Sequence, residues 1–103
     1  MPIATAQEET SAGVPGVRFT TDARPGTAQE EQLQGIQYEL SGGVDLLPSQ
    51  PTVAHLTLHE VATVDGPSHS VVSLWVPTEQ RSRAAERLAG AGFRVSLPGD
   101  PGD

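Results

Sequence analysis

The chain of 103 residues has no cysteine and no lysine. Without cysteine it can form no disulfide, no thiolate nucleophile and no cysteine-ligated zinc site. It also lacks a run of about eighteen apolar residues, which a membrane span requires, and residues 1–15 lack the basic start and apolar stretch of a secretory signal. We therefore expect a cytoplasmic protein with no membrane partner. The absence of lysine and asparagine beside plentiful Ala, Gly, Pro and Arg is typical of a GC-rich bacterial genome.

Positive charge is scarce, because the chain has six arginines and thirteen acidic residues, which give a formal net charge of -7. That sign argues against a protein that binds the phosphate backbone of nucleic acid. The acidity lies mostly at the two ends, and a mimic of nucleic acid would need dense acidic rows on the folded surface instead. We therefore expect no nucleic-acid partner and no nucleic-acid mimicry.

Three regions differ in composition. Residues 1–34 are rich in Gln, Glu, Thr, Ala and Gly, with too few apolar residues to form a core, and we expect this acidic segment to be largely disordered. We also expect that residues 1 to about 30 can be removed with little loss of stability. One short edge strand at residues 14–20 is the exception, because Val17 and Phe19 alternate with polar residues. Residues 35–98 form the predicted domain, and residues 99–103 form a frayed tail.

The predicted domain contains four strands. Ile36, Tyr38 and Leu40 alternate with polar residues and predict a half-buried strand that ends at a Ser-Gly-Gly turn. Residues 44–51 are too rich in proline for a helix and predict a loop. Residues 53–64 alternate as a long strand, residues 65–68 turn the chain, and residues 71–76 are apolar on both faces, which is typical of a central strand. Val95 and Leu97 predict a last short strand.

One helix is predicted over residues 78–91. Thr78 is a suitable N-cap, and the stripe of Ala and Leu that follows predicts one buried face. Gly92 stands where a helix needs a left-handed residue, and Phe93 follows where its ring can pack back on Leu88 as in a Schellman motif. The fold class is therefore α+β, with a small mixed or antiparallel sheet of about four strands and one helix on one face.

The run HSVVSLWVPTEQRSRAAERLAGAGFRVSL, residues 69–97, resembles the closing strand, helix and strand of ACT-type and other ferredoxin-like domains. In those domains an Ala/Leu helix also ends in Gly-Phe and re-enters the sheet. The resemblance covers less than a third of the chain and implies a partial ferredoxin-like fold. ACT domains usually bind amino acids near the loop that leads into their first helix. No segment of this chain matches that loop, so the ligand role does not carry over.

The sheet face opposite the predicted helix is the candidate site. Period-2 alternation places on it six residues that share this face of the two long strands: His55, Thr57, His59, Val71, Ser73 and Trp75. No second helix is predicted to cover them, and an exposed Trp on a central strand is a patch that usually binds something. A second copy of the chain, a ligand or other partner, and the N-terminal segment around Phe19 are the three candidate covers.

His55 and His59 have the HxxxH spacing of a helical metal site, but on a strand four residues separate the Cα atoms by about 13 Å. They cannot share one zinc within a monomer, so we expect no metal site. No nucleophile elbow surrounds any serine, and the glycine-rich pieces lack the lysine of a phosphate loop. We therefore expect no cofactor.

The leading hypothesis is a non-catalytic binding or regulatory accessory module that acts through the exposed sheet face, as a homodimer or with another protein. One alternative is a small cofactor-free enzyme of the dimeric α/β-barrel kind, in which His55 and His59 would transfer protons and Trp75 would stack on a substrate. Another is a phage or mobile-element protein that occupies a host protein. A small ligand on the sheet face is a further candidate partner.

Overall fold

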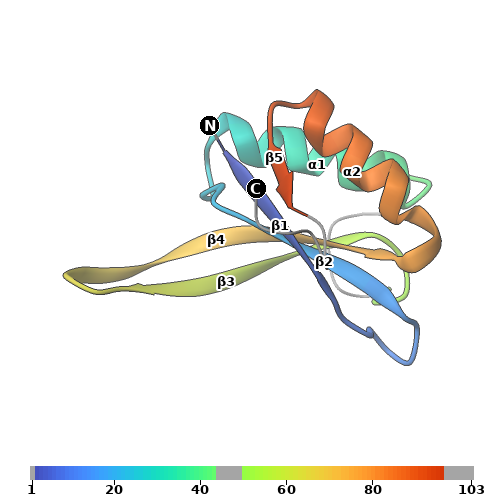
Figure 1. Ribbon diagram of the computed structural model, residues 1–103, viewed down its shortest axis with the longest axis horizontal. Coiled ribbons are helices and arrows are strands. Elements are labelled where there is room, and N and C mark those ends of the chain that lie inside the picture. The colour runs from blue at the N-terminus through green and yellow to red at the C-terminus, as the bar shows by residue number, and fades with distance from the viewer. Residues whose placement is uncertain (1, 44–49, 97–103) are drawn as a thin grey trace.

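The computed structural model describes residues 2–43 and 50–96, which form a sheet with two helices on one of its faces (Figure 1). The elements in chain order are β1 (Ile3–Glu8), β2 (Gly16–Thr21), α1 (Ala28–Leu40), β3 (His55–Thr63), β4 (Gly66–Pro77), a 3₁₀ turn η1 (Thr78–Gln80), α2 (Arg81–Gly90) and β5 (Arg94–Ser96). The five strands lie in the order β3-β4-β2-β1-β5. Neighbouring strands are antiparallel except β1 and β5, which are parallel.

The α+β class is confirmed, with five strands and two helices in place of the predicted four and one. β1, β2 and the first half of α1 lie in residues 1–34, and the expectation that this segment is largely disordered is wrong. Its two strands form an antiparallel hairpin, in which Ala4 and Ala6 lie opposite Thr21 and Phe19. β2 lies in the middle of the sheet and not at its edge, since it pairs with both β1 and β4. Removal of residues 1–30 would therefore delete two paired strands.

Helix α1 replaces the strand that was predicted around Ile36, Tyr38 and Leu40. Thr27 caps the helix, because its hydroxyl accepts the N–H of Glu30, and the Glu30 carboxylate reaches back to the N–H of Gly26. Leu33, Ile36, Gln37 and Leu40 then fall on one buried face, whereas Tyr38 is 55% exposed. Residues 36 and 40 share a face in a helix as well as in a strand, which is why alternation alone gave the wrong element.

The second helical segment covers the predicted range but begins differently. Residues 78–80 form the 3₁₀ turn η1, and Thr78 lies inside this turn and is not an N-cap. The predicted helix end is confirmed: Gly92 has φ +97°, its N–H donates to Ala89 O, and the N–H of Phe93 donates to Leu88 O. These are the two hydrogen bonds of a Schellman motif.

The run that carries the ferredoxin-like resemblance is present as β4, η1, α2 and β5. β4 and β5 run in the same direction. β4 is antiparallel to β2 and β2 is antiparallel to β1, so β4 and β1 run the same way, and β5 is parallel to β1. Two strands lie between them in the sheet. The predicted loop at residues 44–51 lies largely outside the described residues, as do Leu97 of the predicted last strand and the tail.

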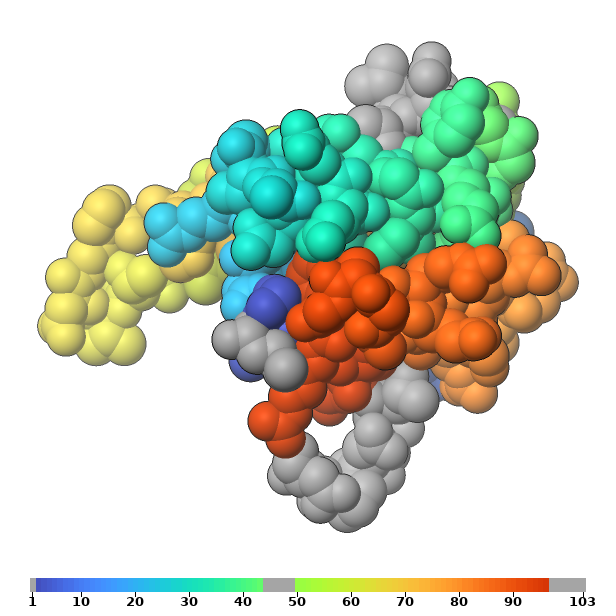
Figure 2. Space-filling model, turned by 90° about the horizontal axis from the view of Figure 1, so that it is seen from above, coloured from blue at the N-terminus to red at the C-terminus, as the bar shows by residue number. Residues whose placement is uncertain are grey.

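The core lies between the helices and the sheet face that they cover. Its largest fully buried apolar members are Phe19, Leu33, Leu74 and Leu88. Figure 2 shows α1 and α2 side by side over this face, with the end of the β3–β4 hairpin projecting beyond them. Within the described residues, neither helix has the length and apolar character needed to cross a bilayer.

Candidate binding surface

The outer face, by which we mean the sheet face without helices, brings the six predicted site residues together. They form three consecutive cross-strand pairs between β3 and β4: His55 with Trp75, Thr57 with Ser73, and His59 with Val71. β2 and β1 extend two of these rows. Arg18 and Gln7 follow Trp75, and Thr20 and Thr5 follow Ser73. The predicted grouping of these residues on one face is therefore confirmed.

Trp75 is fully buried, so the expectation of an exposed indole is wrong. Its Nε1–H donates to the carbonyl of Glu9 at 2.7 Å, and its ring stacks on His55 with centroids 5.2 Å apart. Gly16 lies against the ring, since a Cβ built at this position would be 2.5 Å from Trp75 Cε2. The cover comes from the turn of the β1–β2 hairpin, residues 9–15, together with Gly16 at the start of β2, and not from Phe19, which lies in the core on the opposite face.

A second contact holds this covering turn in place. The hydroxyl of Ser11 donates to the carbonyl of Pro51 at 2.6 Å, which joins the turn to the segment before β3. Ser11 and Val14 also form an isolated bridge that closes the turn. Of the three candidate covers, the N-terminal segment is thus the one found over Trp75, although a different part of it than predicted. The argument for a dimer through an exposed Trp75 loses its premise.

Arg18 is the centre of a polar network beside Trp75. Its Nη1 donates to Ser73 Oγ at 2.7 Å and to His59 Nε2 at 2.8 Å, and its Nε and Nη2 donate to the carboxylate of Glu9. Only 14% of the Arg18 side chain is exposed. The hydrogen bond from Arg18 lowers the pKa of Glu9, against a smaller opposing effect of burial. The network ties the covering turn to β2, β3 and β4 by charge-assisted hydrogen bonds.

The same network determines the state of His59. A guanidinium can only donate, so Nε2 of His59 must offer a lone pair and the proton of the neutral ring belongs on Nδ1. Burial and, next, the positive charge of Arg18 lower the pKa of His59, while Glu9 raises it. His55 Nδ1 lies 2.8 Å from the carbonyl of Val53, so that nitrogen carries a proton.

The arrangement of Ser73 and His59 is poor for catalysis. Ser73 Oγ lies 2.8 Å from His59 Nε2, which is the distance expected of a nucleophile and its base. However, Ser73 is 0% exposed, and its hydroxyl also accepts a hydrogen bond from Nη1 of Arg18. The second enzyme candidate, His55, is also buried and stacked on Trp75. In the described part of the chain, no group of three or more His, Asp and Glu residues could hold a metal ion.

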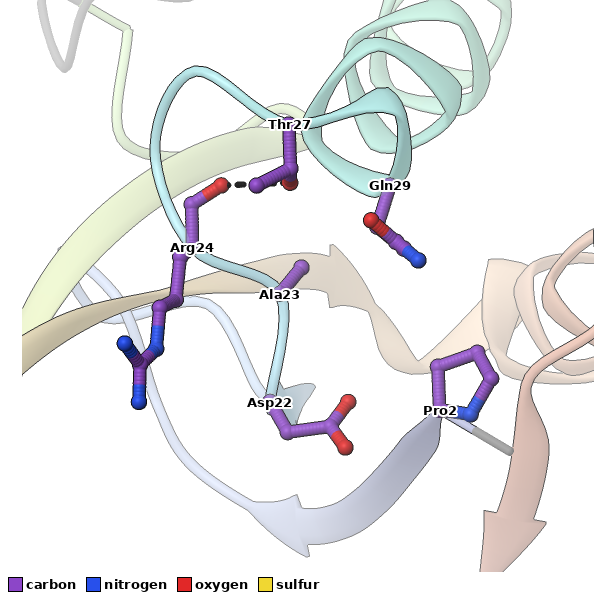
Figure 3. A pocket seen from close by; sticks show the side chains of 6 residues that line it. All are labelled: Pro2, Asp22, Ala23, Arg24, Thr27 and Gln29. Carbon is purple, nitrogen blue, oxygen red and sulfur yellow. Dashed lines mark hydrogen bonds between the residues drawn. The ribbon is translucent and has the colours of Figure 1, made fainter.

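A polar depression of about 360 Å³ lies at the start of α1 (Figure 3). Its lining residues are Pro2, Asp22, Ala23, Arg24, Thr27 and Gln29. The Asp22 carboxylate accepts the N–H of Ile3, and the Thr27 hydroxyl donates to the carbonyl of Arg24. These contacts explain the polar groups as local structure. A second depression, of about 400 Å³ and more apolar, lies between Val14, Pro15 and Pro77.

The most exposed feature is one that sequence analysis did not identify as a site. The far end of the β3–β4 hairpin projects as a two-stranded arm away from the helices and the rest of the sheet (Figure 1). We call residues 60–68 the arm, because every residue in this range is exposed. Leu58 at its base is 59% exposed, and Val61 and Val64 within it are 38% and 98% exposed. The sequence did show the long strands and the turn, but not that the body of the protein ends before the turn.

Comparison with known proteins adds no relative: no family model matches the chain, and no curated protein or solved structure does.

Proposed function

We propose that this protein is a non-catalytic binding module that contacts another protein chain through the arm and the adjoining edge of β3. The observation that carries the proposal is the arm itself. A two-stranded hairpin on which nothing else packs is marginally stable in water; no described element packs on this one, and it also exposes Leu58, Val61 and Val64. Contact with a partner would remove both disadvantages.

The state of the outer face supports binding through the arm in preference to binding or catalysis around Trp75. Trp75, His55 and Ser73 are buried and engaged in contacts within the chain. A substrate would need to displace Arg18 or the covering turn before it reached any of them. Along these two strands, the large apolar side chains that a partner can reach without rearrangement are Leu58 and, in the arm, Val61 and Val64.

Position-specific photocrosslinking of the full chain tests the proposal. A photoreactive p-benzoylphenylalanine is placed at Val64 in one variant and at Tyr38 of α1 in the control, since Tyr38 is also large, apolar and exposed. Irradiation in cells should give discrete adducts from position 64 and few from position 38. Equal adduct yields from the two positions, or none from position 64, would show that the arm is not a binding surface.

A further inference from the structure

The edge of β3 is open for strand pairing. β3 lies at one end of the sheet and pairs only with β4, and within the described residues no strand lies on its other side. The other end of the sheet is β5, of which the structure describes Arg94–Ser96. A long edge strand presents unpaired N–H and C=O groups that readily pair with another chain.

β3 also lacks most of the devices with which proteins protect such edges. Residues 55–61 contain no proline, lysine or arginine, and Glu60 is their one charged residue. Their pairing with β4 is regular from His55 to Val61, and the one register shift lies between Val61 and Thr63. Edge strands are usually protected by charged side chains, lysine above all, by proline, by bulges or by short length, and Glu60 is the one such device in residues 55–61. Residues 55–59 of β3 thus carry none of these devices.

We infer that the partner is a second copy of this chain, joined by antiparallel pairing of β3 with β3 about a twofold axis through Leu58. This inference rests on the proposed function and identifies its partner. The axis would stand perpendicular to the sheet, so residues that face each other come from the same sheet face and the two five-stranded sheets become one.

The register follows from the side chains of β3. With the axis at Leu58, the two Leu58 side chains lie opposite each other on the helix side, at the Cβ separation of about 4.5–5.5 Å found in cross-strand pairs. His55 then faces Val61 of the second copy, and Glu60 faces Leu56. An axis at Glu60 would instead place two carboxylates opposite each other, which is unfavourable.

The same register accounts for the arm. Residues 55–61 of one copy lie along residues 61–55 of the other, so each arm continues past the β3–β3 pairing and runs beside the segment that precedes β3 in its partner. Glu60 and Val61, at the base of each arm, thereby become part of a wider sheet, which stabilises the base of the hairpin. The exposed Leu58 is buried at the centre of the interface, and Val61 obtains an aromatic neighbour in His55 of the second copy.

Sedimentation of the purified full chain over a concentration series is the first test. The parent should form a dimer, and Leu58→Glu should abolish it, because this variant places two carboxylates at the axis. The matched control is Tyr38→Glu, since Tyr38 has nearly the same exposed fraction, 55% against 59%, but lies on α1. It should dimerise like the parent. Fluorescence of Trp75 and the thermal melt verify that both variants are folded.

Oxidative crosslinking tests the register. Because the chain has no cysteine of its own, any disulfide must form at the introduced residue. Leu58→Cys places two thiols opposite each other across the axis, at a separation that a disulfide can bridge with small adjustment. It should form a covalent dimer under mild oxidation. Tyr38→Cys should not. A dimer that resists Leu58→Glu and does not crosslink at position 58 would overturn the β3–β3 pairing.

The outcomes distinguish this inference from the proposed function. A purified parent that remains monomeric throughout the series overturns self-pairing. Position 64 can still give adducts in cells, and the mass of these adducts can differ from twice the mass of the chain. In that case the proposed function is supported, and the partner is a different protein. If position 64 gives no adduct either, both proposals fail together.

Discussion

Substitution of Gly16 by alanine gives the sharpest test of the cover over Trp75. A Cβ at Gly16 would lie 2.5 Å from both Trp75 Cε2 and the carbonyl oxygen of Val76, and it would also overlap Trp75 Cζ2. The indole cannot easily move away, because it is fully buried, stacked on His55 and hydrogen-bonded to Glu9. The backbone carbonyl is fixed by the pairing of β2 with β4.

The magnitude follows from overpacking. Extra atoms in a well-packed core destabilise the folded state by about 1–3 kcal/mol. A clash with both a fixed ring and a backbone atom should cost about 3 kcal/mol, the upper end of this range. Alanine also lowers the conformational entropy of the unfolded chain relative to glycine, which offsets about 0.4–1 kcal/mol of this destabilisation. The free energy of unfolding should therefore fall by about 2 kcal/mol. At about 4–8 °C per kcal/mol for a domain of this size, the Tm should fall by about 8–16 °C.

The matched control is Gly35→Ala, which makes the same chemical change in α1. Gly35 is exposed, and nothing lies within 4 Å of a Cβ built there. Alanine is favoured over glycine inside a helix by about 0.5–1 kcal/mol, so this variant should melt higher than the parent. Thermal unfolding is followed by circular dichroism and by fluorescence of Trp75, which is the one tryptophan of the chain. If Gly16→Ala melts with the parent and keeps its emission maximum, Gly16 does not pack on the indole. If both variants lose stability equally, the clash is not the cause.

Two further predictions concern the end of α2 and the His59 network. Leu88→Ala should lower the free energy of unfolding by about 2–5 kcal/mol, because it leaves a cavity in the core. Gly92→Ala should lower it by about 1 kcal/mol or more, because alanine disfavours the positive φ at this position. If Gly92→Ala melts at the same temperature as the parent, the Schellman motif is contradicted. Because the pKa of His59 is lowered in the folded state, the unfolded chain binds more protons below about pH 6.5, so stability should fall as the pH drops through that region. Glu9 has the lowered pKa of an ion-paired acid, and its contribution should be lost only at lower pH, below about 4.3. Urea unfolding at pH 7.5 and 5.5 should show a smaller difference for His59→Gln than for the parent, and an equal difference would exclude His59 as the source.

The parts of the fold that the sequence predicted are those determined by local pattern. β3 carries a clear period of two residues, α2 one of about 3.6, and β4 a short apolar run, and the Gly92-Phe93 pair marks the helix end. The cross-strand pairing of the candidate site followed from the same alternation, because a short turn joins β3 to β4 and determines which residues face each other. These features depend on neighbours along the chain.

The parts that sequence analysis missed depend on contacts between distant segments. β1 buries Ala4 and Ala6, which are too small to mark a strand by their apolar area, and it is stabilised by pairing with β2 and β5. The cover over Trp75 joins Glu9 to a residue 66 positions away. Helix α1 did leave a local signal, the Thr27 and Glu30 capping box, and that signal outweighs the alternation of Ile36, Tyr38 and Leu40.

The buried Trp75 changes where a partner can bind. Sequence analysis placed the apolar surface of the outer face at Trp75 and expected another molecule to cover it. In the structure the chain covers that part with its own β1–β2 turn, and the Arg18 network holds the turn in place. No described element covers the continuation of the same two strands beyond Leu58, where Val61 and Val64 are exposed. Exposed apolar surface is therefore still the reason to expect association, but this surface lies at the edge of β3 and in the arm and not at Trp75.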